Sequence, residues 1–295
     1  MEGKKKILFI INPISGVSTP FRKNILDQIN NKINREIYDH QIVFTEKAGH
    51  ACKLTINAIK EGYKIIVAVG GDGSINEIAR VITGTDVTLG ILPTGSGNGL
   101  AHHLSIPINI SRAIEVINKC RTIKIDTANI NDLFFLSIAG IGFDATVAQK
   151  YAQEKRRGFL SYFKIITLEY PRYKPKKYTL TIDGKKIKTR ALFISFANSD
   201  QFGYKTTIAP DAKINDGFID VCLVKKMPLI ATPFLAPLIF LKKANRSKYI
   251  KIIKAKEVKL TMRKGKKINL DGESVDVSRK IKLKVNPLSL KVIVP

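Results

Sequence analysis

The sequence predicts two domains of different class: an N-terminal α/β domain with a parallel sheet, and a C-terminal domain of antiparallel strands. The chain has 295 residues, which is long for a single hydrophobic core. Its first part alternates short apolar runs with amphipathic stretches, and its second part has strand-like runs separated by turn pairs such as Asp183-Gly184. We place the domains at residues 1–124 and 125–295 and allow the final strand to return to the first domain.

Hydrophobic periodicity predicts the individual elements. In the first domain, strands are expected at 7–11, 41–45, 65–69 and 88–92, and helices at 21–37, 51–61, 74–82 and 110–118. In the second domain, strands are expected at 133–138, 178–182, 191–197, 218–224, 258–262, 267–270 and 281–285, with helical segments at 145–172 and 229–246. The order of the first domain gathers the carboxyl ends of its strands at one sheet edge.

Composition limits the class of protein. A hydrophobic content of 44% with 25% charged residues is typical of a folded globular chain. The apolar run 7–11 stops at Asn12-Pro13, too early for a signal peptide, and the apolar stretch 227–241 is too short to cross a bilayer, although it could lie on one. The three cysteines have no C-x-x-C spacing, which disfavours a disulfide framework and a zinc site, so a cytoplasmic location is expected.

The chain is strongly basic, with 50 Lys and Arg residues against 24 Asp and Glu residues and a net charge of +26. This charge indicates a polyanionic partner, namely nucleic acid, anionic lipid or a phosphate-rich ligand. The competing explanation is a genome whose base composition favours Lys, Ile and Asn codons. No helix-turn-helix, zinc-finger or aromatic-rich RNA-binding pattern is present in the sequence, so nucleic acid is not the expected partner.

Three glycine-bearing turns follow strands of the first domain. The strongest signal, Gly70–Ser74, joins a buried strand to a helix, and such a turn can hold phosphate oxygens on backbone N–H groups. Within it, Asp72 would be tolerated beside phosphates mainly where a divalent cation lies between them. The turns Asn12–Gly16 and Pro93–Ala101 end two other strands at the same edge. Neither a Walker pattern nor a G-x-G-x-x-G fingerprint is present, so the edge predicts a phosphate site of another kind.

Six segments, in order along nearly the whole chain, resemble the diacylglycerol kinase catalytic family, which includes sphingosine kinases and bacterial lipid kinases. They are Asn12–Gly16, Gly70–Asn76, Pro93–Ala101, Ile138–Asp144, Ala209–Gly217 and Asp271–Glu273. The resemblance implies an ATP-dependent lipid kinase that needs Mg²⁺. It also implies that the second domain is a β-sandwich and that the active site lies in the cleft between the domains.

The resemblance assigns roles to single residues. Glu273 is the expected general base, and Asp72 and Asp126 are the expected acidic pair that organises the catalytic Mg²⁺ through water. The expected nucleotide-binding positions are Asn12, Pro13, Ser15, Gly16, Thr45, Gly70, Gly71, Asp72, Gly73, Ser74, Asn76 and Thr94. A second, structural metal is expected on the side chain of Asp216 and the backbone carbonyls of Lys213 and Phe218.

From the residues alone, several of these assignments have ordinary structural alternatives. Asp126 could cap a turn at the domain boundary, and Asp271-Gly272-Glu273 could be a hairpin, because Asp-Gly is a strong hairpin signal. Arg156 and Arg157 could clamp phosphates or lie on a solvated helix face.

The acceptor is expected to be diacylglycerol, with a long-chain base as the alternative because Gly95–Ala101 is similar to sphingosine kinases. The ammonium group of such a base would need an acid, for which Asp144 is the candidate. A kinase for NAD and a non-catalytic basic module remain further alternatives.

The expected partner is a lipid substrate at an anionic membrane surface. Peripheral contact is expected through the apolar segment Leu229–Leu241 and its flanking lysines. The alternative is that this segment packs as a buried helix of the second domain. The resemblance also leaves a homodimer open.

Overall fold

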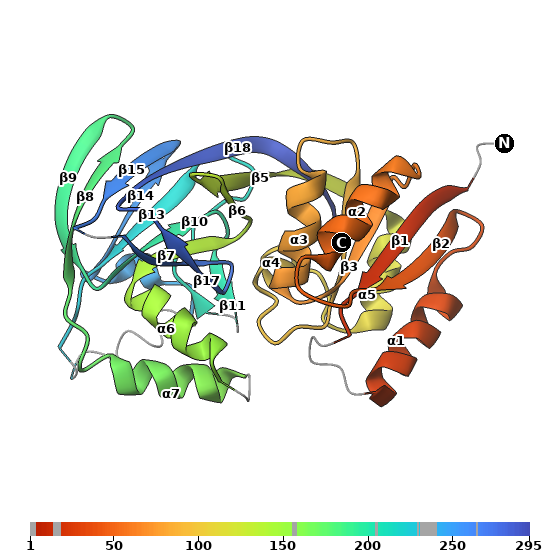
Figure 1. Cartoon of the computed structure of the whole chain (residues 1–295), viewed down its shortest axis with the longest axis horizontal. Coiled ribbons are helices and arrows are strands. Elements are labelled where there is room, and N and C mark those ends of the chain that lie inside the picture. Colours follow the sequence, from red (N-terminus) through yellow and green to blue (C-terminus); the bar gives the residue numbers. More distant parts are fainter. Residues whose placement is uncertain are drawn as a thin grey trace. The chain divides into compact units, whose positions relative to one another are not determined.

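The computed structural model describes residues 4–13, 19–154, 158–203, 206–228, 230, 241–263 and 265–295. The chain folds as two compact units, one formed by Met1–Ile125 with Leu288–Pro295 and the other by Asp126–Pro287. Two strands, β5 (Thr122–Ile130) and β18 (Lys280–Ile293), contain the points at which the chain passes from one unit to the other (Figure 1).

The first unit contains the predicted parallel sheet. Its strands are β1 (Lys5–Ile11), β2 (Tyr38–Phe44), β3 (Ile65–Gly70) and β4 (Thr88–Pro93). They are arranged in the order β2-β1-β3-β4, with the end of β18 beside β4, and every neighbouring pair is parallel. Every residue of β3 and β4 is buried, as expected for parallel strands covered on both faces.

The helices of this unit are α1 (Thr19–Lys32), α2 (His50–Lys60), α3 (Asp72–Ile82), α4 (Gly99–His103) and α5 (Ile110–Lys119). The chain crosses the sheet in one direction from β1 to β2 and in the opposite direction from β2 through β3 to β4. Because such crossovers are right-handed, α1 lies on one face and α2 and α3 on the other, and α2 indeed packs against α3 while α1 packs against α5 (Figure 1). The reversal falls between β1 and β3, the position at which open α/β sheets bind ligands.

The second unit is an antiparallel sandwich, as predicted. Its strands outside β5 and β18 are β6 (Leu133–Phe135), β7 (Ile138–Gly142), β8 (Lys176–Ile182), β9 (Lys185–Ala191), β10 (Phe193–Ala197), β11 (Gln201–Gly203), β12 (Thr206–Thr207), β13 (Ile219–Val224), β14 (Ile250–Ala255), β15 (Glu257–Thr261), β16 (Lys266–Leu270) and β17 (Glu273–Val277). One sheet has the order β14-β13-β10-β7-β16-β17, and the other includes β18, β15, β8 and β9.

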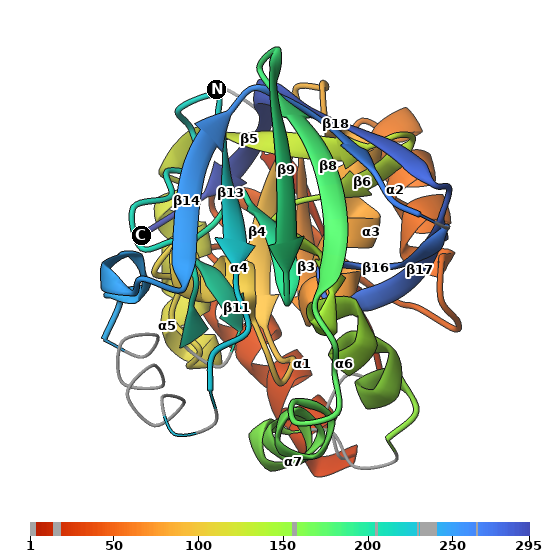
Figure 2. The ribbon, with the colours of Figure 1, turned by 90° about the vertical axis from the view of Figure 1, so that its left-hand side faces the viewer.

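One hydrophobic core joins the two sheets of this unit. Phe196 and Val221 from the first sheet and Leu180 and Leu260 from the second belong to the same buried cluster. All four side chains are at most 1% exposed. In Figure 2 the β8–β9 hairpin of this unit faces the viewer.

The long helix expected at residues 145–172 is two helices, α6 (Phe143–Ala152) and α7 (Phe159–Glu169). Gly158 precedes α7 with a φ of 147°, a conformation that cannot continue a helix. Of the segment expected at 229–246, residues 229 and 231–240 lie outside the described part, and a short 3₁₀ turn occupies Ala244–Arg246. No helix among the described residues is both long and apolar enough to cross a bilayer.

Truncation after Pro287 should unfold the first unit, because it removes the part of β18 that pairs with β4. Leu290, Val292 and Ile293 are at most 1% exposed, and each such side chain contributes about 1.5–3 kcal/mol by burial. Thermal unfolding of the truncated and full chains would measure the effect. The control is Leu288→Ala, since Leu288 is 49% exposed and its truncation should change the melting temperature little. Equal melting of the full and truncated chains would contradict the expectation.

Candidate active site

At the carboxyl edge of the parallel sheet, hydrogen bonds continue past the strand ends and hold four chain segments side by side. The N–H group of Thr45, after β2, donates to the carbonyl of Ile11 at 2.9 Å. The N–H group of Asn12 donates to Val69 at 3.1 Å, and that of Thr94 donates to Gly70 at 3.0 Å. Asn12, Thr45 and Thr94, which the family resemblance assigns to nucleotide binding, therefore lie along one edge.

The turns after β3 and β4 touch through bare backbone. A Cβ atom on Gly95 would lie 2.4 Å from the Cα atom of Gly71, and a Cβ atom on Gly71 would lie 3.1 Å from the Cα atom of Gly95. Asn98 stabilises the second turn, since its side chain accepts from the N–H of Gly95 at 3.0 Å and donates to the carbonyl of Gly95 at 2.7 Å. Asn98 has a φ of 50°, which Asn tolerates better than most residues. Sequence reasoning quoted Asn98 within its turn but assigned it no role.

Asp72 is the first residue of α3, at the point where these turns meet. Its Oδ1 atom lies 3.5 Å from the N–H of Leu100, and a Cβ atom on Gly97 would lie 3.1 Å from its Oδ2 atom. The side chain of Asn12 donates to the hydroxyl of Ser74 in the first turn of the same helix at 3.3 Å. The predicted residues after β1 and β3 are therefore in direct contact.

The features of this edge fit a phosphate group. Gly71 precedes α3 and offers no side chain to cap it, and a helix N-terminus favours anions. The hydroxyl of Thr94 is buried without a hydrogen-bond partner in the described part of the chain. Gly70 is the last residue of β3, and Gly73 and Asn76 lie near the start of α3. The predicted residues Ser15 and Gly16, like Arg156 and Arg157, lie outside the described residues, and Pro13 is the last described residue of its turn.

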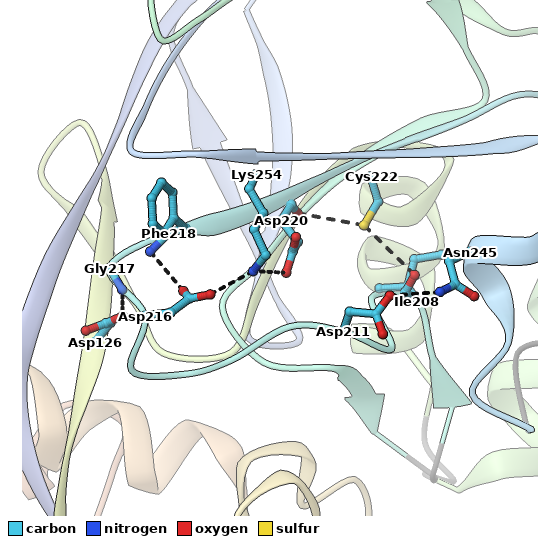
Figure 3. A network of polar contacts seen from close by, with 10 residues as sticks. All are labelled: Asp126, Ile208, Asp211, Asp216, Gly217, Phe218, Asp220, Cys222, Asn245 and Lys254. Atoms are coloured by element: carbon cyan, nitrogen blue, oxygen red, sulfur yellow. Dashed lines mark hydrogen bonds and ion pairs between the residues drawn. The ribbon is translucent and has the colours of Figure 1, made fainter.

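The second unit contains the other predicted acids. Asp126, on β5, is fully buried and holds the loop that precedes β13 (Figure 3). Its N–H donates to Ile214 at 2.7 Å, and its Oδ2 atom accepts from the N–H of Gly217 at 2.6 Å. The side-chain amide of Asn198 donates to the carbonyl groups of Asp126 and Leu136, at 2.9 and 2.7 Å. Asp72 belongs to the first unit and Asp126 to the second.

Asp216 takes part in an ion pair that sequence reasoning missed. Its Oδ1 atom accepts from the N–H of Phe218 at 3.1 Å, and its Oδ2 atom lies 2.7 Å from the ammonium nitrogen of Lys254 (Figure 3). Lys254, on β14, also lies 3.5 Å from Asp220. Burial alone would lower the pKa of Lys254, but the hydrogen bond to Asp216 and the charge of Asp220 raise it. Burial raises the pKa of Asp220 despite the opposing charge of Lys254.

These contacts give Asp216 a partner other than a metal ion. Both oxygens of its carboxylate are engaged, and an ammonium group already neutralises the local charge. In the described part of the chain, no three His, Cys, Asp or Glu side chains are grouped as metal ligands. The structural metal on Lys213, Asp216 and Phe218 therefore stays a prediction, with Lys254 as the alternative source of positive charge.

Glu273 follows a tight hairpin turn between β16 and β17. Asp271 and Gly272 form the turn, with φ values of 47° and 94°, so the hairpin reading of this Asp-Gly pair is correct. The carboxylate of Asp271 accepts from the N–H groups of Leu136, Ser137 and Ile138 at 2.7–3.0 Å. Glu273 is exposed at the start of β17. A strong local anchor therefore precedes the predicted base.

Lys254→Met is expected to lower the stability of the second unit by on the order of 1 kcal/mol, because it leaves Asp216 and the buried Asp220 without a counter-charge. Asp216→Ala should lower the melting temperature as well, and a chelator should leave that of the wild type unchanged. Lys251→Met, an exposed lysine on the same strand, is the matched control. A melting temperature that falls with chelator and recovers with Mg²⁺ would support the structural metal instead.

Comparisons with known proteins identify the family. The model of the diacylglycerol kinase catalytic domain matches residues 6–130, and that of the YegS C-terminal NAD kinase beta sandwich-like domain matches residues 137–294, more than half of the chain. Diacylglycerol kinase of Bacillus subtilis (strain 168) is 28% identical over 91% of this chain and 90% of its own length. Diacylglycerol kinase of Staphylococcus aureus (strain MRSA252) is 27% identical over 92% and 86%.

The fold agrees with these matches. The crystal structure of a diacylglycerol kinase from Bacillus anthracis str. Sterne superposes with a TM-score of 0.80 over 99% of this chain and 97% of that chain, at 24% identity. The two consecutive domain matches agree with the glycine-lined sheet edge in the first unit and with the sandwich in the second. The chain belongs to the diacylglycerol kinase catalytic family and is a phosphotransferase of the lipid-kinase type, with an alcohol group as acceptor.

Proposed function

We propose that the chain transfers the γ-phosphoryl group of ATP to the hydroxyl group of diacylglycerol. The observation that carries this proposal is the contact between Gly71 and Gly95 at the N-terminus of α3, which leaves a bare backbone surface. Backbone N–H groups in such a surface suit the oxygens of a polyphosphate chain. Phosphoryl transfer needs mainly alignment and charge neutralisation, which a surface of this kind supplies.

In this proposal the nucleotide lies along the sheet edge. The N–H groups at the start of α3 hold phosphate oxygens, and the unpartnered hydroxyl of Thr94 donates to one of them. Asn12 and Thr45, at the ends of β1 and β2, complete the edge. Ser15 and Gly16 belong to the proposed site through the family resemblance alone.

Mg²⁺ is proposed as the cofactor, and the family resemblance assigns Asp72 and Asp126 to hold it through water. When bound, it would neutralise charge on the phosphates during transfer. Asp72 is suited to this role because its carboxylate lies beside the proposed phosphate surface, where a negative charge needs a cation.

Glu273 is proposed as the general base. As the acceptor oxygen bonds to the γ-phosphorus, its proton passes to the carboxylate of Glu273 and the bond to the β-phosphate oxygen breaks, which releases ADP. The exposed position of Glu273 after an anchored turn supports this role, since a base must reach the substrate from a fixed backbone.

Diacylglycerol is preferred to a long-chain base because of the position of Asp144. This side chain is 6% exposed, and its Oδ2 atom already accepts a hydrogen bond from Asn269 at 3.0 Å. An ammonium group would have to reach a buried, engaged carboxylate, whereas neutral diacylglycerol needs no acidic partner.

Asp72→Asn should leave the fold intact and lower turnover roughly a thousandfold, because several kcal/mol of transition-state alignment are lost. Glu273→Gln should lower turnover while the KM for ATP stays near its original value. Transfer of radiolabel from ATP to diacylglycerol, sphingosine or NAD, each supplied separately, measures both effects and the acceptor. Asp86→Asn and Asp276→Asn, at exposed acids of the two units, are the matched controls. Near-normal turnover of Asp72→Asn would contradict the proposed phosphate site. Labelling of sphingosine alone or NAD alone would contradict diacylglycerol as the acceptor.

We further propose that the second unit docks on an anionic membrane through α7. Four apolar side chains of this helix point into solvent, with exposures of 39–81%: Phe159, Leu160, Phe163 and Leu168. Ile230 and Leu241, the two described residues of the segment first expected at the membrane, are 82% and 63% exposed. Tyr170, just after α7, exchanges hydrogen bonds with the backbone of Met227, two residues before the segment.

The charge of the chain is compatible with such a surface, because each Lys or Arg near anionic lipid contributes about 1 kcal/mol at low salt. The net charge is +26, and exposed Lys164 lies on α7 itself. Peripheral docking of this kind would bring the protein to a substrate that stays in the bilayer. A homodimer stays a prediction.

Leu160→Ser with Phe163→Ser should weaken binding to phosphatidylglycerol vesicles at least about tenfold, because each apolar side chain contributes about 1.5–3 kcal/mol when it leaves water. Co-sedimentation at two salt concentrations measures the binding, with phosphatidylcholine vesicles for comparison. The control is Ile56→Ser, an exposed isoleucine of α2. Binding that is indifferent to the paired substitution, to anionic lipid and to salt would rule out this surface.

A further inference from the structure

Asp144 is a buried carboxyl group that the proposed phosphoryl transfer does not use. It lies in the first turn of α6 and rests against the backbone of β7. A Cβ atom on Gly140 of that strand would lie 1.7 Å from its Oδ2 atom. The place of this carboxyl group therefore depends on the absence of a side chain at Gly140.

Asn269, on β16, connects Asp144 to the hairpin turn that precedes Glu273. Its Nδ2 atom donates to Asp144 at 3.0 Å, and its Oδ1 atom accepts from the N–H of Gly272 at 2.9 Å. A carboxylate can only accept and a backbone N–H can only donate, so the two contacts together define one orientation of the amide. Reversal of the amide would turn both contacts repulsive.

The turn is thus held from two sides. Asp271 anchors it to the backbone of residues 136–138, and Asn269 holds the N–H of Gly272, the residue directly before Glu273. Hydrogen bonds thus hold two consecutive residues of the turn, and Glu273 is the next residue of the backbone.

The other Asp-Gly hairpin of the unit shows that the turn itself does not need this arrangement. Asp183 and Gly184, between β8 and β9, have φ values of 44° and 84°, close to those of Asp271 and Gly272. The residue that corresponds to Asn269 is Thr181, and the residue that corresponds to Glu273 is Lys185. The amide and the buried acid are therefore additions to the hairpin whose next residue is Glu273.

Asp144 also carries a cost in stability. Burial raises its pKa to about 6, while the hydrogen bond from Asn269 lowers it. Because this pKa lies above the ordinary value, the protonated form favours folding, and stability is lost as the pH rises through about 6. A neutral residue would avoid this loss at neutral pH.

Among the described side chains, no charged group on the elements packed against α6 forms an ion pair with this acid. Those elements are β7, β10, β16, β17 and α7. β7 and β10 carry no charged residue. The charged residues are Lys266 and Lys267 on β16, Glu273 and Asp276 on β17, and Lys164 and Glu169 on α7. α6 itself also carries Lys150. Lys267, Glu273, Asp276 and Lys164 are exposed, and Glu169 pairs with Lys150.

We infer that Asp144 is a positioning residue for Glu273 and acts through the side-chain amide of Asn269. The inference rests on the proposed role of Glu273 as general base. The base must be held in place to accept a proton in line with transfer, and small displacements of such a group are costly.

Asp144→Ala and Asn269→Ala should each lower kcat on the order of tenfold, with the KM for ATP unchanged. Asp144→Asn should restore most of the loss seen in Asp144→Ala, because its amide oxygen can still accept from Asn269. The double variant Asp144→Ala with Asn269→Ala should be no slower than the slower single variant, because both act through one connection. Steady-state kinetics with Mg²⁺-ATP and diacylglycerol in mixed micelles, with melting temperatures for each variant, measures these effects.

The matched control is Asn118→Ala in the first unit. Asn118, on α5, makes a similar pair of contacts at the end of α1, since it accepts from the N–H of Asn34 and donates to the carbonyl of Lys32. Its substitution should leave kcat unchanged.

Full kcat in Asp144→Ala, or losses that multiply in the double variant, would overturn the inference. If Asp144→Ala does not fold, the kcat of Asn269→Ala is compared with that of Asp144→Asn. Full kcat in Asn269→Ala, or equal losses of kcat in the two variants, would overturn the inference. Glu273→Gln is measured in parallel. Full turnover there would remove the proposed base, whereas an inactive Glu273→Gln beside a fully active Asp144→Ala would remove the positioning role alone.

Discussion

The contact between the backbones of Gly71 and Gly95 is the constraint on which the candidate site depends. A side chain at Gly95 would collide with the opposite turn, and one at Gly71 would press tightly against it, so the ends of β3 and β4 meet through glycines. The N-terminus of α3 has no side-chain cap at Gly71, and Asp72 lies beside Leu100. Glycine weakens a chain entropically, and here the loss is offset by the buried strands on which both turns rest.

In the first unit glycines determine how neighbouring turns meet, and in the second unit carboxylates hold the loops and turns. Asp126 and Asp271 accept backbone N–H groups of a distant segment, and Asp216 accepts one within its own loop. Such bonds are stronger than neutral ones because the acceptor is charged. An acid in this unit can therefore be structural, catalytic or both, and its sequence motif does not separate these roles. What distinguishes Glu273 is its exposure beside a turn that other acids hold.

Much of the fold could be predicted because its elements follow hydrophobic periodicity. β3 and β4 are continuous apolar runs, and their predicted bounds differ from the structure by one residue. β9 and β14 were missed because lysines occupy their exposed positions, so the apolar alternation is sparse in Lys185–Ala191 and Ile250–Ala255. β17 was missed because it directly follows the Asp271-Gly272 turn, which is the strongest pattern in that part of the sequence.

The glycine turns at the sheet edge could also be predicted, because local sequence encodes them. The partners of the acids could not: Lys254 lies 38 residues from Asp216, and Asn269 lies 125 residues from Asp144. Nothing in the sequence near either acid indicates which strand will lie beside it. Such pairs are set by strand register, and a register shift of one residue would turn Asn269 to the opposite face of β16. The sandwich therefore determines the surroundings of Glu273 through pairings that no local motif contains.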